Sequence, residues 1–433
     1  MKTILFLLYL LSSLYALPFS LIKHETSENE GPTLLVIGGI HGNEPGSYFA
    51  ASILSQYYTI TKGNLWIVPN LNALSIAMNS RGINGDMNRK FADINATDPD
   101  LNIVQEIEKI ITDPKVELIL NLHDGHGFYR KEYKNTIFNP GAWGQTCVID
   151  QETLEGNYPY KDLDKIALAV GQEINGGLIE DHHCFTIRNT NTRFDDEAMR
   201  HSLTFFAINN NKPAFAIETS KNLPLLNEKV FYQLRAIEGY MRYMGITYTR
   251  SFDLNSENLK NILQCDGNVT INSTATLNLE NLRNELSFIP LQLEGNDFKF
   301  SHPLGFVVKK SNKYDVYIGN KKITSLTPSL HQAGIYEGNV SIEVDNLQKN
   351  ITLATEFSVN ADFKVILHNK DMRVNIIGYS PKNGSDEANV HVSMNDLDPK
   401  YSLDRDHRVY RVEFYRGDRF CGMVLAHFKQ DTR

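Results

Sequence analysis

The stretch Leu34-Leu35-Val36-Ile37-Gly38-Gly39-Ile40-His41-Gly42-Asn43-Glu44 is the most informative part of this 433-residue chain. An apolar run ends in two glycines and then presents an imidazole and a carboxylate three residues apart. Of the 13 histidines, only His41 is followed three positions later by glutamate. Histidine nitrogen and carboxylate oxygen both bind Zn²⁺, and a catalytic zinc ion keeps one position open beside three protein ligands. The pattern therefore predicts a strand followed by two metal ligands, with a third ligand elsewhere.

His123 is the candidate for the third ligand. It follows the apolar run Leu118-Ile119-Leu120-Asn121-Leu122 and precedes a turn that contains glycine. In open α/β sheets, ligands bind beyond the carboxyl ends of the strands, so His123 is expected to lie near His41 and Glu44. His126 is a weaker candidate, which we expect to line the pocket wall or to have no role.

Glu218 is the candidate for a general base, because it ends a third apolar run, Phe215-Ala216-Ile217. Hydrolysis at a metal needs a group that takes a proton from water and later delivers it to the leaving group. The alternative for this glutamate is a helix N-cap or a surface salt bridge.

Two arginines lie in the loop that follows the expected strand Leu65–Val68. Arg89 offers a fork of donors that matches a carboxylate, and Asn88 beside it adds an amide donor. Arg81 is placed to polarise a scissile carbonyl and stabilise its oxyanion. Isolated loop arginines are usually solvated, so these roles depend on the neighbouring metal site.

The chain divides into an α/β part and a β-rich part. Between residues 33 and 245, short apolar runs alternate with amphipathic helical patterns, which predicts a parallel or mixed sheet flanked by helices. After Arg250 the chain shows short runs of period two separated by turn signals, which is typical of all-β domains. The predicted divisions are a signal peptide (1–16), an α/β domain (17–250), a small β domain (251–345) and a second β domain (346–433).

The predicted strands of the α/β part are residues 34–40, 65–68, 116–122 and 214–217, and the predicted helices are residues 48–58, 101–111, 161–174 and 228–244. In the β-rich part, the clearest strand candidates are residues 306–308, 314–318, 363–367, 390–392 and 409–414.

Composition and the N-terminal pattern limit which compartment and which partners we expect for this protein. The net charge of -8 and the lack of a dense basic stripe argue against nucleic acid as the partner. Lys2, the short apolar core of residues 4–11 and Ala16 are typical of a secretory signal peptide, with a buried N-terminal element as the alternative. We therefore expect an exported protein without stable membrane insertion. Cys147 and Cys184 are either a disulfide pair or free thiols.

The α/β domain resembles the zinc carboxypeptidase superfamily, in its succinylglutamate desuccinylase and aspartoacylase branch, over about residues 30 to 245. The resemblance implies that His41, Glu44 and His123 bind zinc and that Glu218 is the catalytic base. It also implies that Arg81 contacts the scissile carbonyl and that Asn88-Arg89 binds a substrate carboxylate.

Over nearly the whole chain, the sequence is similar to the DL-carboxypeptidases that trim peptidoglycan and set the shape of helical Gram-negative bacteria. In that group the first zinc position can be glutamine, whereas here it is His41. The resemblance implies a β-barrel-like domain and an immunoglobulin-like domain after the catalytic domain. It further implies a periplasmic enzyme that releases meso-diaminopimelate from the tripeptide L-Ala–γ-D-Glu–meso-diaminopimelate, with Trp143 as a substrate contact. A packed loop tryptophan is the alternative for Trp143.

Two other functions stay open. The domain could deacylate a small N-acyl amino acid, or the chain could be a non-catalytic wall-binding scaffold whose β domains contact envelope proteins. Three acidic Asn-x-Ser/Thr patterns, at Asn95, Asn268 and Asn339, are possible glycosylation sites.

Overall fold

The structure is a computed structural model of the chain, and it describes residues 18–26, 31–195, 197–336, 338–367, 371–380 and 387–430. The predicted signal peptide, residues 1–16, lies outside the described residues. Where the chain is described, no helix combines the length and the apolar character that crossing a membrane would need.

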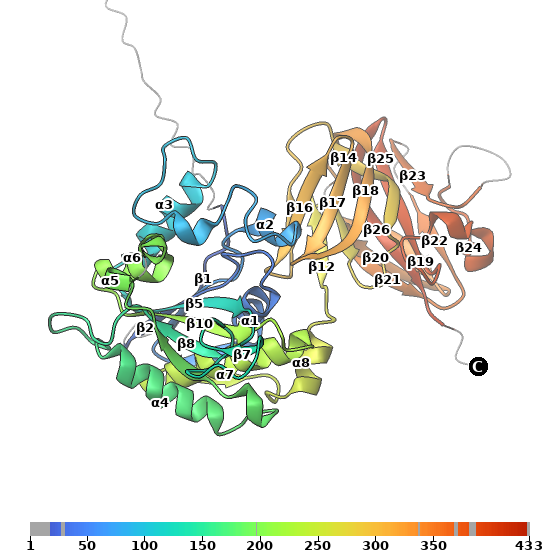
Figure 1. Cartoon of the computed structure of the whole chain (residues 1–433). Coiled ribbons are helices and arrows are strands. Elements are labelled where there is room, and N and C mark those ends of the chain that lie inside the picture. Colours follow the sequence, from blue (N-terminus) through green and yellow to red (C-terminus); the bar gives the residue numbers. More distant parts are fainter. Residues whose placement is uncertain are drawn as a thin grey trace, which may run out of the picture.

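A seven-stranded mixed sheet forms the centre of the N-terminal part (Figure 1), in the order β1-β4-β2-β5-β10-β8-β9. The four central strands are parallel, while β1 and β8 pair antiparallel with their inner neighbours. The strands of this sheet are β1 (Ile22–Glu25), β2 (Thr33–Ile37), β4 (Asn64–Val68), β5 (Val116–Gly125), β8 (Thr146–Ile149), β9 (Thr186–Asn189) and β10 (Ala214–Ser220). Every residue of β2 and β4 is buried, as expected for parallel strands covered on both faces.

Helices cover both faces of the sheet. In Figure 1, α4 and α7 lie on one side, and α3 and α6 lie on the other. Proline at the first position of α1 and a left-handed glycine, Gly245, after α7 are ordinary start and stop signals. The helices are α1 (Pro45–Tyr57), α2 (Ala73–Ala77), α3 (Leu101–Ile111), α4 (Leu163–Asn175), α5 (Thr192–Asp195), α6 (Leu203–Asn209), α7 (Leu226–Met244) and α8 (Ser256–Ile262), with the 3-10 turns η1 (Met87–Arg89), η2 (Asp181–His183) and η3 (Ala198–His201).

Two short ribbons complete this part, and they are β3 (Tyr58–Lys62) with β11 (Thr247–Arg250), and β6 (Phe128–Tyr129) with β7 (Phe138–Asn139).

The sequence placed His123 and Glu218 just beyond their strands, and this placement was wrong by a few residues. Both lie inside strands, because the parallel pairing of β5 with β10 continues past the apolar runs to Ser220 and Gly125. Glu218 is the register partner of His123. The two functional side chains are therefore fixed by a hydrogen-bonded ladder instead of a loop.

The C-terminal part is built from β-sheets, which confirms the predicted fold class. The three-stranded sheet contains β12 (Asn268–Ile271), β13 (Ala275–Asn278) and β15 (Phe298–Phe300). The eight-stranded sheet contains β14 (Glu285–Gln292), β16 (Gly305–Lys310), β17 (Lys313–Ile318), β18 (Lys321–Ala333), β21 (Glu356–Val359), β23 (Met372–Ile376), β25 (Val409–Arg416) and β26 (Arg419–Phe428). The four-stranded sheet contains β19 (Asn339–Val344), β20 (Leu347–Thr352), β22 (Asp362–Ile366) and β24 (Val392–Ser393), followed by the 3-10 turns η4 (Met394–Asp396) and η5 (Pro399–Tyr401).

The four-stranded sheet and the C-terminal strands of the large sheet contribute side chains to one hydrophobic core, which makes a two-layer sandwich. The predicted domain division at residue 345 falls in the turn of the hairpin β19–β20. Because a hairpin belongs to one domain, we propose that the division lies earlier, between β18 and β19.

The β-rich part packs directly against the α/β part. Leu304 belongs to the same core as the central sheet. The side-chain amides of Gln56 and Asn70 donate to the carbonyl oxygens of Ser301 (3.3 Å) and Pro303 (3.4 Å). The segment around His302 is therefore one contact between the two parts.

Candidate metal centre and active site

His41 and Glu44 lie in the tight loop between β2 and α1, and Glu44 occupies the N-cap position of that helix without a capping hydrogen bond from its side chain. A Cβ atom at Gly42 would overlap the carbonyl group of Ser75, so only glycine allows the loop to pass this close to α2. The glycine between the two candidate ligands is therefore required by packing.

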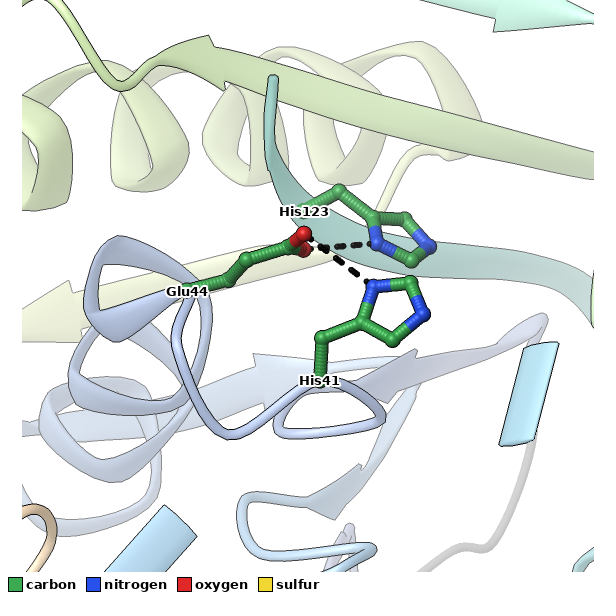
Figure 2. Close-up of side chains that lie close together, drawn as sticks. All are labelled: His41, Glu44 and His123. Atoms are coloured by element: carbon green, nitrogen blue, oxygen red, sulfur yellow. Dashed lines mark hydrogen bonds and ion pairs between the residues drawn. The ribbon is translucent and has the colours of Figure 1, made fainter. Parts of the chain in front are cut away.

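The three predicted ligands converge (Figure 2). The carboxylate of Glu44 lies between the two imidazoles, with one oxygen 3.1 Å from Nδ1 of His41 and the other 2.9 Å from Nδ1 of His123. One potential ligand atom from each residue lies within 4.8 Å of the others. All three residues are at most 3% exposed, so the site is held by packing as well as by these contacts.

The buried nitrogen of His41 shows that these residues fit a metal ion. Nε2 of His41 lies 2.8 Å from a carboxylate oxygen of Asp86, whereas the buried Nδ1 faces Glu44 and has no hydrogen-bond partner among the described residues. When Nε2 carries the proton, the lone pair of Nδ1 faces the carboxylate of Glu44, and two acceptors repel each other unless a cation lies between them. A divalent metal satisfies all of these groups at once, and Asp86 is then the outer partner that orients His41.

The electrostatics of the buried groups agree with this assignment. Burial alone would lower the pKa of His41, but the carboxylates of Glu44 and Asp86 outweigh it and raise that pKa. Burial would likewise raise the pKa of Glu44, but the imidazoles of His41 and His123 hold it well below the usual range. A metal ion therefore competes with a proton for this site.

Glu218 faces the same pocket from β10. Burial, together with the nearby carboxylates of Glu44 and Asp124, raises the pKa of Glu218 well above its usual value. A glutamate with a raised pKa can both accept and donate a proton near neutral pH, which is what a general base that becomes a general acid must do.

Arg81 contacts the metal site directly. Its guanidinium lies 3.3 Å from the carboxylate of Glu44 and donates to Asp86 at 3.0 Å, while nearly half of the side chain is exposed to the pocket. A partly exposed guanidinium beside the metal ligands is suited to stabilise charge on a substrate oxygen.

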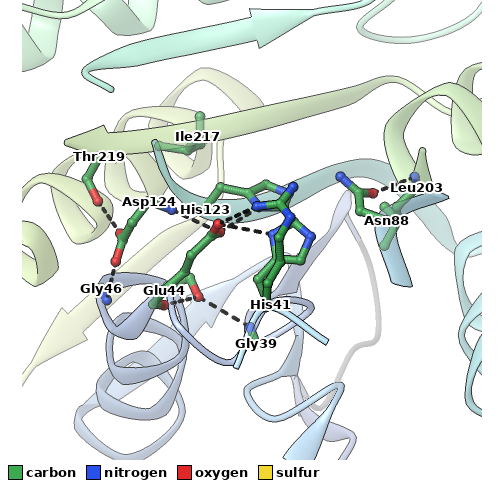
Figure 3. Close-up of polar contacts among 12 residues, drawn as sticks. Gly39, His41, Glu44, Gly46, Asn88, His123, Asp124, Leu203, Ile217 and Thr219 are labelled. Carbon is green, nitrogen blue, oxygen red and sulfur yellow. Dashed lines mark hydrogen bonds and ion pairs between the residues drawn. The ribbon is translucent and has the colours of Figure 1, made fainter. Parts of the chain in front are cut away.

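Asn88 and Arg89 lie in η1. Figure 3 shows Asn88 on the opposite side of the ligands from Asp124. The side-chain oxygen of Asn88 accepts from the backbone N–H of Leu203 at 2.9 Å, which leaves its amide nitrogen to donate elsewhere. Arg89 donates to the carbonyl oxygen of Asn88 at 2.8 Å and lines the pocket. The pair thus offers two kinds of donor to an anion.

All eight residues predicted from the sequence line one pocket of about 230 Å³, and they are His41, Glu44, Arg81, Asn88, Arg89, His123, Trp143 and Glu218. Trp143 stacks under the guanidinium of Arg188, whose central carbon lies 3.7 Å from the ring centre. His126 is exposed on the pocket wall and is not one of the three clustered ligands.

Sequence reasoning missed three charged residues of this site, Asp86, Asp124 and Lys221. Asp124 accepts from the N–H of Gly46 (2.8 Å) and from Thr219 (2.5 Å), so it ties the start of α1 to β10. Each of these residues lies within three positions of a predicted site residue, but the residue that it contacts is remote in sequence. Only the three-dimensional structure therefore shows that it belongs to the site.

The four described cysteines are free thiols, with Cys147 buried and Cys184 half-buried, so the disulfide alternative is wrong. Asn95, Asn268 and Asn339 are all exposed, and their glycosylation stays a prediction.

The mixed sheet, the His–Glu–His cluster at the carboxyl ends of its strands, the buried glutamate and the adjacent arginines define the class. It is the class of metallocarboxypeptidase hydrolases.

Comparison with known families shows which family of this class the chain belongs to. Residues 1–264 match the family described as the catalytic part of a carboxypeptidase controlling helical cell shape, and residues 335–429 match the C-terminal domain of metallo-carboxypeptidase. The chain belongs to this family of cell-shape carboxypeptidases.

Solved structures agree over the whole length. The chain is similar to the tripeptide-bound cell shape determinant Csd4 from Helicobacter pylori, with 33% identity, a TM-score of 0.89, and coverage of 95% of this chain and 100% of the other. It is equally similar to the mDAP-bound form of the same D,L-carboxypeptidase, with 33% identity, a TM-score of 0.90, and coverage of 94% and 100%. The comparison with curated proteins gave no match.

Proposed function

We propose that the protein is a periplasmic, zinc-dependent DL-carboxypeptidase that releases meso-diaminopimelate from peptidoglycan tripeptides and thereby affects cell shape. The observation that carries the proposal is the single pocket that brings the three clustered ligands together with Glu218, Arg81 and the Asn88–Arg89 pair.

His41, Glu44 and His123 are the residues that would hold the metal. Zinc, when bound, supplies a Lewis acid that activates water and polarises a carbonyl group. Glu218 accepts the proton of the attacking water and delivers it to the leaving amine nitrogen. Arg81 stabilises the charge that develops on the carbonyl oxygen.

Asn88 and Arg89 fix the substrate by its terminal carboxylate. The orientation of the Asn88 amide, set by the N–H of Leu203, points its donor group away from the protein hydrogen bond. A guanidinium and an amide together match the two oxygens of a carboxylate. This clamp supports release of a C-terminal residue, which is the carboxypeptidase reaction. Trp143, on the pocket wall, is proposed as a further substrate contact.

The substrate and the compartment follow from the relatives and from the N-terminus. The Helicobacter pylori protein has been solved with tripeptide and with mDAP bound. The pattern of residues 1–16 supports export, and a periplasmic enzyme would meet peptidoglycan peptides.

The test is a substrate panel for the zinc-loaded protein and its Arg89→Ala variant. The panel contains the tripeptide, its C-terminal amide and several N-acyl amino acids. We expect the wild type to hydrolyse the tripeptide, to act weakly on the amide, and to lose its preference for the free carboxylate when Arg89 is truncated. Hydrolysis of N-acyl amino acids in preference to the tripeptide would contradict the proposal and favour a deacylase.

A non-catalytic scaffold is tested by the metal content of the purified protein. We expect one zinc ion per chain after loading, and lost stoichiometric binding in Glu44→Ala. A wild type that binds no metal and cleaves nothing would favour the scaffold.

A further inference from the structure

Lys221 is a cation of the pocket that the reaction described above does not use. It is the first residue after β10, and its backbone is fixed from three directions. Its N–H donates to the carbonyl oxygen of Gly125 at 2.7 Å. Its neighbours Ser220 and Asn222 both bond the backbone of Gly127, at 2.5 and 2.8 Å. The start of this side chain is therefore held rigidly at the pocket edge.

The ammonium group of Lys221 points at the metal site. Nζ lies 3.3 Å from a carboxylate oxygen of Glu44, and the side chain, about one-third exposed, lines the pocket. Among the described residues, Glu44 is the ion-pair partner recorded for this ammonium. Arg81 shares the same oxygen of Glu44 but also has Asp86 as a second partner.

Metal binding would change the surroundings of Lys221. A divalent cation held by Glu44 neutralises the carboxylate that faces Lys221 and repels the nearby ammonium. When the metal is bound, Arg81 still has its ion pair with Asp86, whereas Lys221 loses its ion pair with Glu44. The backbone of Lys221 is rigidly held, and its side chain is partly exposed. Once its counter-ion is neutralised, the ammonium is suited to bind an anion that enters with the substrate.

Lys221 and Arg89 lie on opposite sides of the metal ligands. Arg89 lies in the segment after β4 and Lys221 follows β10, and the sheet order places β2 and β5, which lead to the three ligands, between them. Figure 3 shows the same separation, with Asn88 on one side of the ligands and Thr219 on the other. A peptide whose terminal carboxylate binds Arg89 therefore extends its acyl portion toward Lys221.

We propose that Lys221 binds a carboxylate on the acyl side of the scissile bond and selects substrates that carry one there. This inference rests on the proposed function. In a γ-linked glutamyl peptide the α-carboxylate of glutamate stays free on the acyl side, separated from the scissile carbonyl by the α-carbon and two methylene groups, whereas a peptide with an uncharged residue there presents no carboxylate. Lys221 is thus the specificity-determining residue for an acidic residue on the acyl side, as Arg89 is for the terminal carboxylate.

The test compares two peptides that differ in one group. The first is the γ-linked tripeptide with a free glutamate α-carboxylate, and the second carries a carboxamide there. For the zinc-loaded wild type we expect kcat/KM to favour the carboxylate by about 10- to 100-fold, which is the range of one charge-assisted hydrogen bond. Lys221→Met should abolish this preference and Lys221→Arg should keep most of it. Lys165→Met, at an exposed ion pair on α4, is the matched control that keeps it fully.

A binding measurement gives a readout that does not depend on turnover. Calorimetry should show that the dipeptide product L-Ala–γ-D-Glu binds the zinc-loaded wild type more tightly than its α-amide does. The difference should vanish in Lys221→Met while the zinc content stays at the wild-type level.

Three results would overturn the proposal. Equal hydrolysis of both peptides by the wild type would remove Lys221 as the selecting residue and leave the proposed function intact. An equal loss on both peptides in Lys221→Met would mean that Lys221 acts only through Glu218 or the metal. A wild type that hydrolyses neither peptide would overturn the proposed function and this inference with it.

Discussion

Gly125 shows how tightly single residues constrain the active site. A Cβ atom at this position would lie 2.5 Å from Cβ of Trp143 and 2.8 Å from a carboxylate oxygen of Glu218. We therefore expect Gly125→Ala to displace the base and the tryptophan, to cost about 1–3 kcal/mol of folding stability, and to lower kcat/KM at least about 10-fold.

Gly171→Ala in α4 is the matched control for that substitution, because nothing lies within 4 Å of the added Cβ. It should leave kcat/KM unchanged and raise stability slightly, since alanine favours a helix over glycine by up to about 1 kcal/mol. Thermal unfolding and tripeptide hydrolysis measure both effects. Normal activity in Gly125→Ala would show that the pocket is less closely packed than described.

The pH dependence of the reaction reports on Glu218. The base must be ionised, so activity falls as the pH falls through its pKa, and burial beside Glu44 and Asp124 raises that pKa. We expect the acidic limb of kcat/KM to lie above about pH 4.3, which is the pKa of an ordinary glutamate. Glu218→Gln should retain zinc and lose about 10²–10⁴-fold in kcat. A limb at or below the ordinary value, or wild-type turnover in Glu218→Gln, would contradict the assigned role.

The sequence was sufficient to find the functional candidates that are marked by a pattern in the neighbouring residues. His41, His123 and Glu218 each follow an apolar run, so both their type and their place were readable. Asp86 and Lys221 were missed because each belongs to the site only through a contact with a residue that is distant in the chain. Asp86 contacts His41, and Lys221 contacts Glu44. A hydrogen bond across 45 residues leaves no pattern in the intervening sequence.

At the scale of elements, we expect the segment that joins β15 to β16 to be a pH-sensitive contact between the two parts of the molecule. His302 lies between Ser301 and Pro303, whose carbonyl oxygens accept hydrogen bonds from the α/β part, and its Nδ1 accepts from the N–H of Leu304 at 3.1 Å. Burial lowers the pKa of His302 to about 4.

The sign of the effect on stability follows from proton binding. Between about pH 6.5, the ordinary value, and about pH 4, the unfolded chain binds a proton at His302 and the folded chain does not, so stability falls as the pH falls through this window. His302→Asn keeps an acceptor for Leu304 but cannot titrate. We expect its melting temperature to fall less than that of the wild type between pH 7 and pH 5. An identical fall in both proteins would contradict the effect.

Long periodic elements were predicted well and short edge elements were not. The predicted bounds of α3, Leu101–Ile111, agree with the structure, because its apolar spacing is regular and its ends are polar. β8 and β9 were missed because each has only four residues, and strands of that length carry little periodicity. The predicted domain division near residue 345 falls in the turn between β19 and β20, because hairpin turns and linkers have similar compositions, and the division that we propose between β18 and β19 stays a prediction.

For the whole molecule, metal binding should contribute to stability as well as to activity. Nδ1 of His41 and a carboxylate oxygen of Glu44 face each other at 3.1 Å in the buried site, and a metal held by both would bridge them. A ligand that binds only the folded state stabilises it by about 2.7 kcal/mol at 100 times its Kd. We expect chelation to lower the melting temperature and to abolish turnover, and zinc to restore both.

Acidic conditions should weaken metal binding, because protons compete for His41, whose pKa Glu44 and Asp86 raise. Metal titrations at several pH values check this directly. A melting temperature that does not respond to chelation would mean that the three clustered residues hold no metal in the folded protein.

The most direct test of the central claim is mass spectrometry of peptidoglycan muropeptides before and after incubation with the zinc-loaded protein. The account predicts that tripeptide muropeptides lose one diaminopimelate residue and become dipeptides, and that Glu218→Gln leaves them unchanged. Unchanged tripeptides with the active wild type, or loss of any other group, would contradict it.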